Sequence, residues 1–331
     1  MQKFVVCICY IFVSFIILPA IITFSYKGFQ GLYQKELSIQ ANEIGEQYYY
    51  LDSNIDTISY LKILNPINGQ VEYLNFEEYL IGVVAAEMPA LFEIEALKAQ
   101  AVASRTFAIG NIDIDKVYTD LNINTTGQAY LTIEQMKERW GDNFDIHYDK
   151  ISTAVYSTKG ELILYQEEPI LAVFHATSSG VTEYSSDVWQ AQRPYLVSVD
   201  SSFDESVPGF ITEANYTENE FISIMRQSYP DIIFSNEDLI NQIVINELTS
   251  AGAVKSVTVG NKTMSGRDLR TVLNLRSSNF TVRKENDNII FTTKGHGHGA
   301  GMSQTGANIL AQQGFTYKEI LTHYYQGVTI K

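Results

Sequence analysis

The stretch EEYLIGVVAAEMPALFEIEALKAQAVASRTFAIG, from Glu77 to Gly110, determines the fold expected for this chain. Its first half predicts a helix over residues 76–86, because apolar residues recur at the i, i+3 and i+4 spacing of one buried helical face. Glu87 occupies the i+7 position of that face. Pro89 disfavours the helical conformation at the residue before it, so the sequence places Glu87 at the C-terminus of the helix, on its apolar side.

Glu87 therefore stands in surroundings that are unusual for a carboxylate. Burial and the negative end of the helix dipole would both favour its neutral, protonated form. A carboxylic acid that stays protonated near neutral pH is what a general acid requires. A glutamate at a helix end can also turn into water or pair with a nearby arginine, and the local pattern leaves this structural alternative open.

The second half of the stretch predicts another helix, over residues 93–109. Acidic residues lie in its first turn, and Gly110 follows as a C-terminal cap. Lys98 and Arg105 are seven positions apart and share one face of this helix. That face could return to Glu87 and hold a group of a substrate, or it could be a basic surface in contact with water.

The composition excludes one class of ligand and favours another. The chain has 331 residues and a net charge of −15, so no basic stripe is available to neutralise nucleic-acid phosphates. Its 21 tyrosines and 17 phenylalanines suit a carbohydrate, because sugar rings stack on aromatic rings, although a tyrosine-rich core would explain them as well. The only cysteines are Cys7 and Cys9, which leaves the rest of the sequence without a disulfide or a cysteine-based zinc site.

The N-terminal segment predicts a membrane anchor. Residues 4–24 carry no charge and have the length of a membrane-spanning helix, and the residues that follow form a poor cleavage site for a signal peptide. We therefore expect an uncleaved transmembrane anchor over residues 1–25 and a polar juxtamembrane stalk over residues 26–59. Lys3 favours a cytoplasmic N-terminus.

The rest of the chain predicts an α+β fold, in which a mixed α/β catalytic domain carries an inserted, smaller α+β subdomain. Two strands joined by a turn precede the first helix. We expect the catalytic domain to comprise residues 60–205 and 288–331. Residues 206–287, in which predicted helices and strands alternate, form the inserted subdomain.

Three blocks of the sequence resemble one known family. They are YLIGVVAAEMPALFEIEALKAQAVASRTFA within the stretch quoted above, FHATSSGVTEYSSDVW at residues 174–189, and GHGHGAGMSQTGANILAQQGFTYKEILTHYYQGVTI at residues 295–330. Together they resemble the stage II sporulation protein D family, whose members are peptidoglycan lytic transglycosylases. The resemblance implies that Glu87 is the catalytic acid.

This reaction needs fewer carboxylates than hydrolysis. Most glycoside hydrolases use two, because water must be activated or a covalent intermediate formed. A lytic transglycosylase needs one, since the C6 hydroxyl of N-acetylmuramic acid is the nucleophile and closes a 1,6-anhydro ring. The same glutamate can protonate the glycosidic oxygen and later accept the hydroxyl proton.

Other residues in and near the three blocks are expected to bind substrate. The turn HATSSG, residues 175–180, presents hydroxyl and backbone N–H donors at a strand end, where they could contact an acetamide or a developing charge. A Ser–His hydrolase is an alternative, but the turn lacks a nucleophile elbow. Gln304 could contact an acetamide or belong to a helix cap. The expected substrate-binding residues are Lys98, Arg105, His175, Ser178, Ser179, Tyr195, His298, Ser303, Gln304, Tyr324 and Tyr325.

The glycine-rich segment 295–301 raises the question of a metal site. His296 and His298 form an H-x-H pattern, but the alternating glycines favour a close crossing of two backbone segments, with His298 as a hydrogen-bonding or core residue. Some members of the family bind zinc through histidine and cysteine just before the sequence QAY, and residues 122–127 of this chain contain neither. We therefore expect no metal and no cofactor.

The function that the resemblance implies, together with the predicted anchor, is that of a membrane-anchored lyase. It would cleave the MurNAc–GlcNAc bond of peptidoglycan glycan strands during engulfment in sporulation, from the cell-wall side of the engulfing membrane. The resemblance implies strands stripped of stem peptides as substrate, and stage II sporulation proteins P and M as partners. A non-catalytic glycan-binding module that stimulates a cell-wall amidase is the alternative. A structural wall tether is a third class, which leaves the apolar surroundings of Glu87 unexplained.

Overall fold

The structure covers one of the two units into which the chain divides. These units are residues 1–58 and residues 59–331, and everything described below belongs to the second. The computed structural model describes residues 60–64, 71–111, 128–189 and 191–331.

The expected membrane anchor falls in the first unit. Residues 1–25 and the stalk at 26–59 lie outside the described residues, so the structure leaves both as predictions. Within the described ranges, no helix combines the length and the apolar character needed to cross a membrane.

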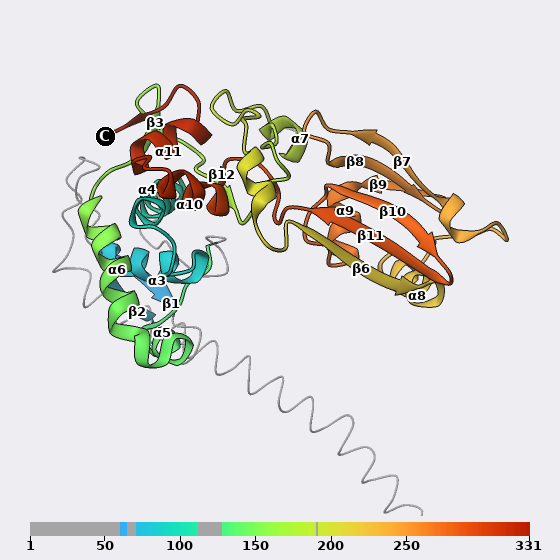
Figure 1. The fold of residues 1–331 in the computed structure, drawn as a ribbon, viewed down its shortest axis with the longest axis horizontal. Coiled ribbons are helices and arrows are strands. Elements are labelled where there is room, and N and C mark those ends of the chain that lie inside the picture. Colours follow the sequence, from blue (N-terminus) through green and yellow to red (C-terminus); the bar gives the residue numbers. More distant parts are fainter. Residues whose placement is uncertain (1–59, 65–70, 112–127, 190) are drawn as a thin grey trace, which may run out of the picture. The chain divides into compact units, whose positions relative to one another are not determined.

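Helices and strands alternate along the described chain, which confirms the mixed α+β character predicted from the sequence. One group of helices surrounds α4, which contacts α3, α6, α10 and α11 (Figure 1). The helices of this group and its neighbours are α3 (Phe76–Glu87), α4 (Ile94–Asn111), α5 (Ile133–Trp140), η3 (Gly141–Asn143), α6 (Phe144–Ser157), α7 (Ser185–Trp189), η4 (Ser202–Ser206), α10 (Gln304–Gln312) and α11 (Tyr317–Tyr324).

Helix α4 lies at the centre of this group because its sequence is rich in small side chains. Ala96, Ala99 and Ala101 are fully buried, as are two further alanines in the same helix. Alanine allows neighbouring helices to approach closely on several sides, and a helix that is apolar on most sides is usually buried. The sequence of α4 therefore explains why four other helices pack against it.

The ends of α3 follow local rules. The side chain of Asn75 accepts a hydrogen bond from the backbone N–H of Glu77 at 3.0 Å and caps the first turn. The helix ends at Glu87, and Met88 is extended, with φ −120° and ψ 145°. This end confirms the prediction based on Pro89. The predicted cap at Gly110 is wrong, because α4 continues through that residue to Asn111.

Short strands join segments that are far apart in the sequence. The hairpin expected before α3 is confirmed as β1 (Tyr60–Leu64) and β2 (Val71–Asn75). Strand β12 (Met302–Ser303) pairs in parallel with β5 (Phe174–His175), so the second and third of the three family-like blocks lie side by side. A third sheet contains β3 (Ile163–Tyr165), β4 (Glu168–Pro169) and β13 (Thr329–Ile330).

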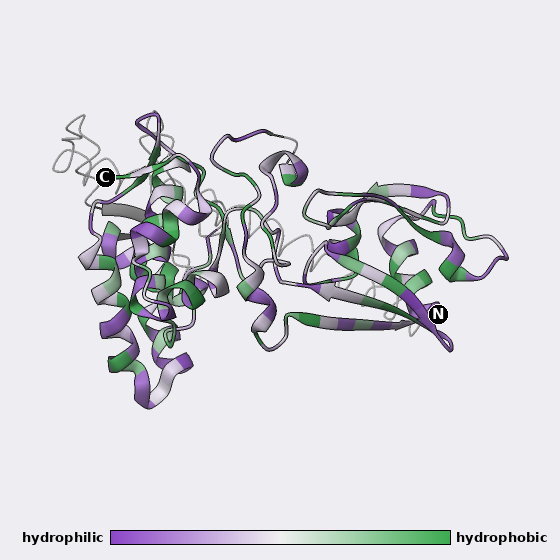
Figure 2. Ribbon diagram, turned by 45° about the horizontal axis from the view of Figure 1, so that its top comes forward, coloured by the Kyte–Doolittle hydropathy of each residue, from purple (hydrophilic) through white to green (hydrophobic). Residues whose placement is uncertain are grey.

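A second hydrophobic core lies within residues 211–294. It is formed by buried residues such as Phe221, Leu269 and Phe291. Figure 2 shows hydrophobic and hydrophilic residues alternating along β6 (Ile211–Thr217), as expected for a strand with one face toward water. The other elements here are α8 (Glu218–Ser228), η5 (Leu239–Gln242), β7 (Ile243–Leu248), β8 (Val254–Val259), β9 (Lys262–Ser265), α9 (Gly266–Val272), β10 (Phe280–Glu285) and β11 (Asn288–Lys294).

The two sheets of this core have the orders β10-β11-β6 and β7-β8-β9, and all of their pairings are antiparallel. Strand β11 begins at Asn288, directly after the predicted domain boundary at 287, and lies between β10 and β6. The sheet therefore extends past that boundary.

Candidate active site

Glu87 is the last residue of α3, and its half-buried carboxyl is held by two neighbours. The backbone N–H of Ala129 donates to Oε1 at 3.1 Å. The side chain of Gln304 makes a second hydrogen bond. Burial, the cause expected from the sequence, raises the pKa of the carboxyl above its ordinary value, and the two hydrogen bonds oppose this rise. The group can therefore hold a proton at a higher pH than an exposed glutamate, while its ionised form still has donors.

The donor at Ala129 is placed by the segment that crosses α3 at Gly82. A Cβ atom added at Gly82 would lie 2.2 Å from Cε2 of Tyr130 and 2.7 Å from the carbonyl oxygen of Leu131. The N–H of Leu131 donates to the carbonyl oxygen of Gly82 at 3.1 Å. Glycine at this position lets the segment lie directly against the helix. The segment is thereby fixed where its backbone can reach Glu87.

Gln304, whose hydrogen bond lowers the pKa of Glu87, comes from the C-terminal part of the chain. It is the first residue of α10, whose N-cap is Ser303. Gln304 is 7% exposed, and its Nε2 donates to Oε1 of Gln100 at 3.2 Å. The sequence predicted either an acetamide contact or a capping role for Gln304. The structure gives the N-cap role to Ser303 and bonds the Gln304 amide to Gln100, and the acetamide contact stays a prediction.

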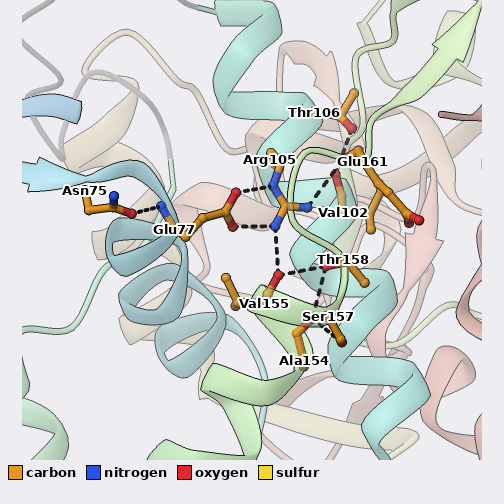
Figure 3. Close-up of polar contacts among 10 residues, drawn as sticks. All are labelled: Asn75, Glu77, Val102, Arg105, Thr106, Ala154, Val155, Ser157, Thr158 and Glu161. Carbon is orange, nitrogen blue, oxygen red and sulfur yellow. Dashed lines mark hydrogen bonds and ion pairs between the residues drawn. The ribbon is translucent and has the colours of Figure 1, made fainter. Parts of the chain in front are cut away.

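Arg105 bonds to Glu77 and not to Glu87, so the return to Glu87 that the sequence left open as one alternative is not what the structure shows. Its guanidinium is 1% exposed and binds Glu77 through two hydrogen bonds, of 3.2 Å from Nε and 2.6 Å from NH2 (Figure 3). Glu77 lies in the first turn of α3, and Glu87 is its last residue. The ten residue steps from Glu77 to Glu87 span about 15 Å of helix.

The rest of the Arg105 guanidinium is bonded to backbone. NH2 donates to the carbonyl oxygen of Val155 at 3.1 Å, and NH1 donates to that of Glu161 at 3.3 Å. Figure 3 shows Arg105 reaching from α4 between α3 and the end of α6. Because these partners are all within the protein, Arg105 holds the helices together, and the role of a substrate ligand stays a prediction for it.

Lys98 is also engaged within the protein. Its Nζ lies 2.7 Å from Oε1 of Glu95 and 5.7 Å from the ring centre of Tyr317. The side chain of Lys98 is 22% exposed, so these contacts lie at the surface. The predicted sharing of one helix face by Lys98 and Arg105 therefore does not make a common site.

Several other predicted substrate ligands are buried around Asp204. Oδ2 of Asp204 accepts hydrogen bonds from the backbone N–H of Ser178 at 2.8 Å and from the hydroxyl of Ser303 at 2.7 Å. It also accepts one from Ser201 at 3.3 Å, whose hydroxyl lies 3.0 Å from that of Tyr324. The structure shows Ser178, Ser303 and Tyr324 bonded within the protein, and their substrate-binding roles stay predictions. These fully buried groups join the central and C-terminal blocks.

The sequence did not indicate that Asp204 is buried or that it bonds these residues. It lies in the turn SFDES, where an aspartate is ordinarily a solvated turn residue, and its burial arises only from contacts with segments distant in sequence. Burial raises the pKa of its carboxyl, and the hydrogen bonds from the serines oppose this rise.

Tyr195 and Tyr325 also hold the scaffold. The phenol oxygen of Tyr195 accepts from the backbone N–H of Leu171 at 3.0 Å, and the phenol of Tyr325 donates to the carbonyl oxygen of Val173 at 2.8 Å. Tyr195 is 7% exposed and Tyr325 is fully buried. The two rings fix the segment that leads into His175, and the groove-lining roles stay predictions for them.

The crossing expected at the glycine-rich segment is confirmed. A Cβ atom added at Gly297 would lie 2.7 Å from Cβ of His175, and one added at Gly295 would lie 2.6 Å from the carbonyl oxygen of Ser178. The backbone of residues 295–301 therefore crosses directly over the HATSSG turn. Ser179 lies in the same turn and is half-buried.

The two histidines at this crossing stay neutral at ordinary pH. Nδ1 of His175 lies 3.1 Å from the carbonyl oxygen of Ala300 and must donate to it, and burial lowers the pKa of His175 to about 3. Nδ1 of His298 accepts from the N–H of Ala300 at 3.2 Å, and burial lowers the pKa of His298 to about 4. His298 is half-buried and accepts a hydrogen bond, which is the first of the two options that the sequence left open for it.

The prediction that the protein binds no metal can be compared with only part of the chain. Residues 122–127 lie outside the described residues, so the predicted lack of zinc there stays a prediction. Across the ranges that are described, no group of three metal-ligating side chains is close enough to hold an ion.

A second buried carboxyl, Glu183, was missed by the sequence analysis. Its Oε1 accepts from the hydroxyl of Thr249 at 3.0 Å, and its Oε2 has no partner among the described residues. Burial raises the pKa of Glu183 to about 7. Thr249 follows β7, so this contact joins the central block to the second hydrophobic core.

Comparison with known proteins agrees with the three-block pattern. A family described as SpoIID, stage II sporulation protein, matches residues 67–165, which include Glu87 and the segment around Gly82. The chain is 38% identical to stage II sporulation protein D of Bacillus amyloliquefaciens, over 80% of this chain and 76% of that protein. It is 37% identical to stage II sporulation protein D of Bacillus subtilis, over 82% of this chain and 78% of that protein.

A more distant similarity extends to a protein with a different name. The chain is 28% identical to the amidase enhancer of Bacillus subtilis, over 76% of this chain and 40% of that protein. The two matches to stage II sporulation protein D cover most of both chains. This chain therefore belongs to the stage II sporulation protein D family.

Proposed function

We propose that this sporulation protein is a lytic transglycosylase that cleaves peptidoglycan glycan strands, with Glu87 as both general acid and general base. The observation that carries the proposal is the environment of Glu87. Burial raises the pKa of its carboxyl, while an N–H from Ala129 and the amide of Gln304 stand ready to stabilise the carboxylate. A group that must give up a proton and then take one back needs both features.

The reaction uses this carboxyl twice. The protonated Glu87 donates its proton to the oxygen of the MurNAc–GlcNAc bond, and the bond between that oxygen and C1 of MurNAc breaks. The C6 hydroxyl of the same MurNAc then attacks C1 and gives its proton to the Glu87 carboxylate. The products are a 1,6-anhydroMurNAc end and a free GlcNAc hydroxyl, and Glu87 is again protonated.

Product chemistry tests this proposal. The full chain would be incubated with purified glycan strands, and the ends of the fragments identified by mass spectrometry. A transglycosylase gives 1,6-anhydroMurNAc ends. Ordinary reducing ends would show a hydrolase instead, and intact strands would exclude both reactions.

A glycan-binding module that stimulates a cell-wall amidase is the second candidate, and the similarity to an amidase enhancer favours it. The Glu87→Gln variant separates the two candidates. If stimulation of an amidase depends on strand cleavage, this variant should not stimulate. A binding module would stimulate the amidase equally well with glutamine at this position.

The cellular setting belongs to the same proposal. The uncharged run at residues 4–24 would anchor the chain in the engulfing membrane of the forespore, with residues 60–331 on the cell-wall side. There it would act with stage II sporulation proteins P and M on strands already stripped of stem peptides. Protease added to intact protoplasts should then digest the body of the protein, and complete protection would contradict this orientation.

A further inference from the structure

Three arginines, Arg267, Arg270 and Arg276, lie on neighbouring segments and are called the arginine cluster below. Arg267 and Arg270 are three positions apart in α9 and share one face of that helix. Nε of Arg270 donates to the carbonyl oxygen of Leu275 at 3.2 Å, which brings its guanidinium against the backbone just before Arg276. The carbonyl oxygen of Arg276 accepts from the N–H of Gly297 at 2.9 Å. The arginine cluster therefore lies beside the glycine-rich segment that crosses the HATSSG turn.

An aromatic ring lies next to the arginine cluster. NH1 of Arg267 donates to the carbonyl oxygen of Val188 at 3.2 Å, directly before Trp189 at the end of α7. The ring centre of Trp189 lies 5.0 Å from that of His298, and the indole is half-buried, so part of it faces water. A sugar ring stacks its C–H face on such an aromatic surface. Positive charge and a stacking surface for a sugar therefore occur together.

The arginine cluster has no counter-ion in the part of the chain that the structure describes. None of the three guanidinium groups forms an ion pair there, although the whole chain carries a net charge of −15. Asp187, the acid of α7, pairs with Lys255 at 3.8 Å instead. Arg270 is half-buried, and burial lowers its pKa. Because removing an unpaired charge from water is unfavourable, an anion that supplies the missing partner would be bound.

His296 adds a further donor. NH2 of Arg276 lies 3.1 Å from Nδ1 of His296. A guanidinium can only donate, so Nδ1 accepts and the neutral imidazole carries its proton on Nε2. Burial, together with the charge of Arg276, keeps the pKa of His296 below its ordinary value. The groups gathered here therefore offer N–H donors, which match the two oxygens of a carboxylate.

We propose that the arginine cluster and Trp189 form a binding site for the carboxylate of an acidic sugar. The inference rests on the function proposed above, which makes a peptidoglycan glycan strand the ligand. In such a strand the acid attached directly to a sugar ring is the lactyl group of N-acetylmuramic acid. It is a carboxylate only where hydrolysis of its amide bond has released the stem peptide as a free amine. The site therefore distinguishes a stripped sugar from one that still carries its peptide.

Binding of chemically matched strands tests this site. Dissociation constants would be measured by calorimetry for the full chain carrying Glu87→Gln, so that strands are not cut. Stripped strands should bind about 10- to 100-fold more tightly than the same strands with their lactyl carboxylates converted to methylamides, because hydrogen bonds between two charged groups are lost. Equal affinity for these two preparations would overturn the proposal. Strands that keep their stem peptides should bind as weakly as the methylamides, and tight binding of them would show that the site takes a peptide carboxylate instead.

Substitutions show whether the arginine cluster causes this difference. Arg270→Gln, added to the same chain, should reduce the preference for stripped over methylamide strands to within about 3-fold. Arg226→Gln is the matched control, because it removes the same charge at an exposed position of α8 in the same hydrophobic core. If Arg270→Gln lowers the folded fraction, Arg267→Gln replaces it, since Arg267 is exposed. A preference that keeps its full size in the variant used would overturn the assignment to these arginines.

The same measurements separate failure of this site from failure of the proposed function. If stripped strands bind through the arginine cluster but the wild-type chain forms no 1,6-anhydro product, the site stands and the transglycosylase proposal falls. If the wild-type chain forms that product, but neither the methylamides nor Arg270→Gln changes the KM for strands, the site falls and the enzyme remains.

Discussion

The buried pair between Arg105 and Glu77 predicts a large loss of stability on a small chemical change. Glu77→Gln keeps the shape of the side chain but removes its charge, which leaves a guanidinium at 1% exposure without a counter-ion. The two carbonyl oxygens of Val155 and Glu161 stay bonded to it but carry no net charge. Breaking one partner of a buried pair costs about 3–5 kcal/mol. We expect the free energy of unfolding, measured by urea titration at pH 7, to fall by about this amount.

Two comparisons identify the source of this loss. Lys98→Ala removes a pair whose side chains are 22% and 26% exposed, and such a surface pair contributes about 0–1 kcal/mol. The double variant Glu77→Leu with Arg105→Met removes both charges, and should be more stable than Glu77→Gln alone. A loss below about 1 kcal/mol for Glu77→Gln, equal to that for Lys98→Ala, would refute the assignment of Arg105 to the scaffold.

Three further predictions follow from individual contacts. The pKa of Glu183 is about 7 in the folded chain and about 4.5 when exposed, so the folded state binds the proton more tightly, and the free energy of unfolding should fall by on the order of 3 kcal/mol as pH rises from about 4.5 through 7. Glu183→Gln should flatten this part of the pH profile measured by urea titration. An unchanged slope of the free energy of unfolding against pH in that variant would contradict the raised pKa. Gly82→Ala should lower the free energy of unfolding by about 1–3 kcal/mol and reduce cleavage of glycan strands, because the added Cβ would meet the ring of Tyr130 and displace the N–H donor at Ala129. Wild-type values of both the unfolding free energy and the cleavage rate would show that the segment crossing Gly82 does not position Glu87. EDTA should leave cleavage unchanged, because a reaction with one carboxylate needs no Lewis acid, and recovery of an EDTA-inactivated sample by zinc alone would contradict this.

Features set by short stretches of sequence could be predicted. The end of α3 at Glu87 depends on Pro89 two residues later, and the crossing at Gly297 depends on alternating glycines. Both effects are local to the backbone. The raised pKa of Glu87 was also predictable, because its position on the apolar face of a helix indicates burial.

Features that depend on partners distant in sequence could not be predicted. The spacing of Lys98 and Arg105 shows that they share a helix face, but not that Glu77 and a carbonyl of α6 lie opposite Arg105. Asp204 and Glu183 are buried only because segments far along the chain meet them. The number of tyrosines likewise suggested a groove lined by tyrosine rings for a sugar. The composition could not show that the hydroxyl of Tyr325 donates to the backbone carbonyl oxygen of Val173.

The rate of 1,6-anhydroMurNAc formation by Glu87→Gln, compared with the wild-type chain at saturating glycan strands, tests the central claim most directly. Glutamine fills the space of the glutamate but has no proton to donate, so the rate should fall by at least about 10²–10⁴-fold while strand binding and the free energy of unfolding stay near wild type. A Glu87→Gln variant that forms the anhydro product at close to the wild-type rate would show that another group is the acid.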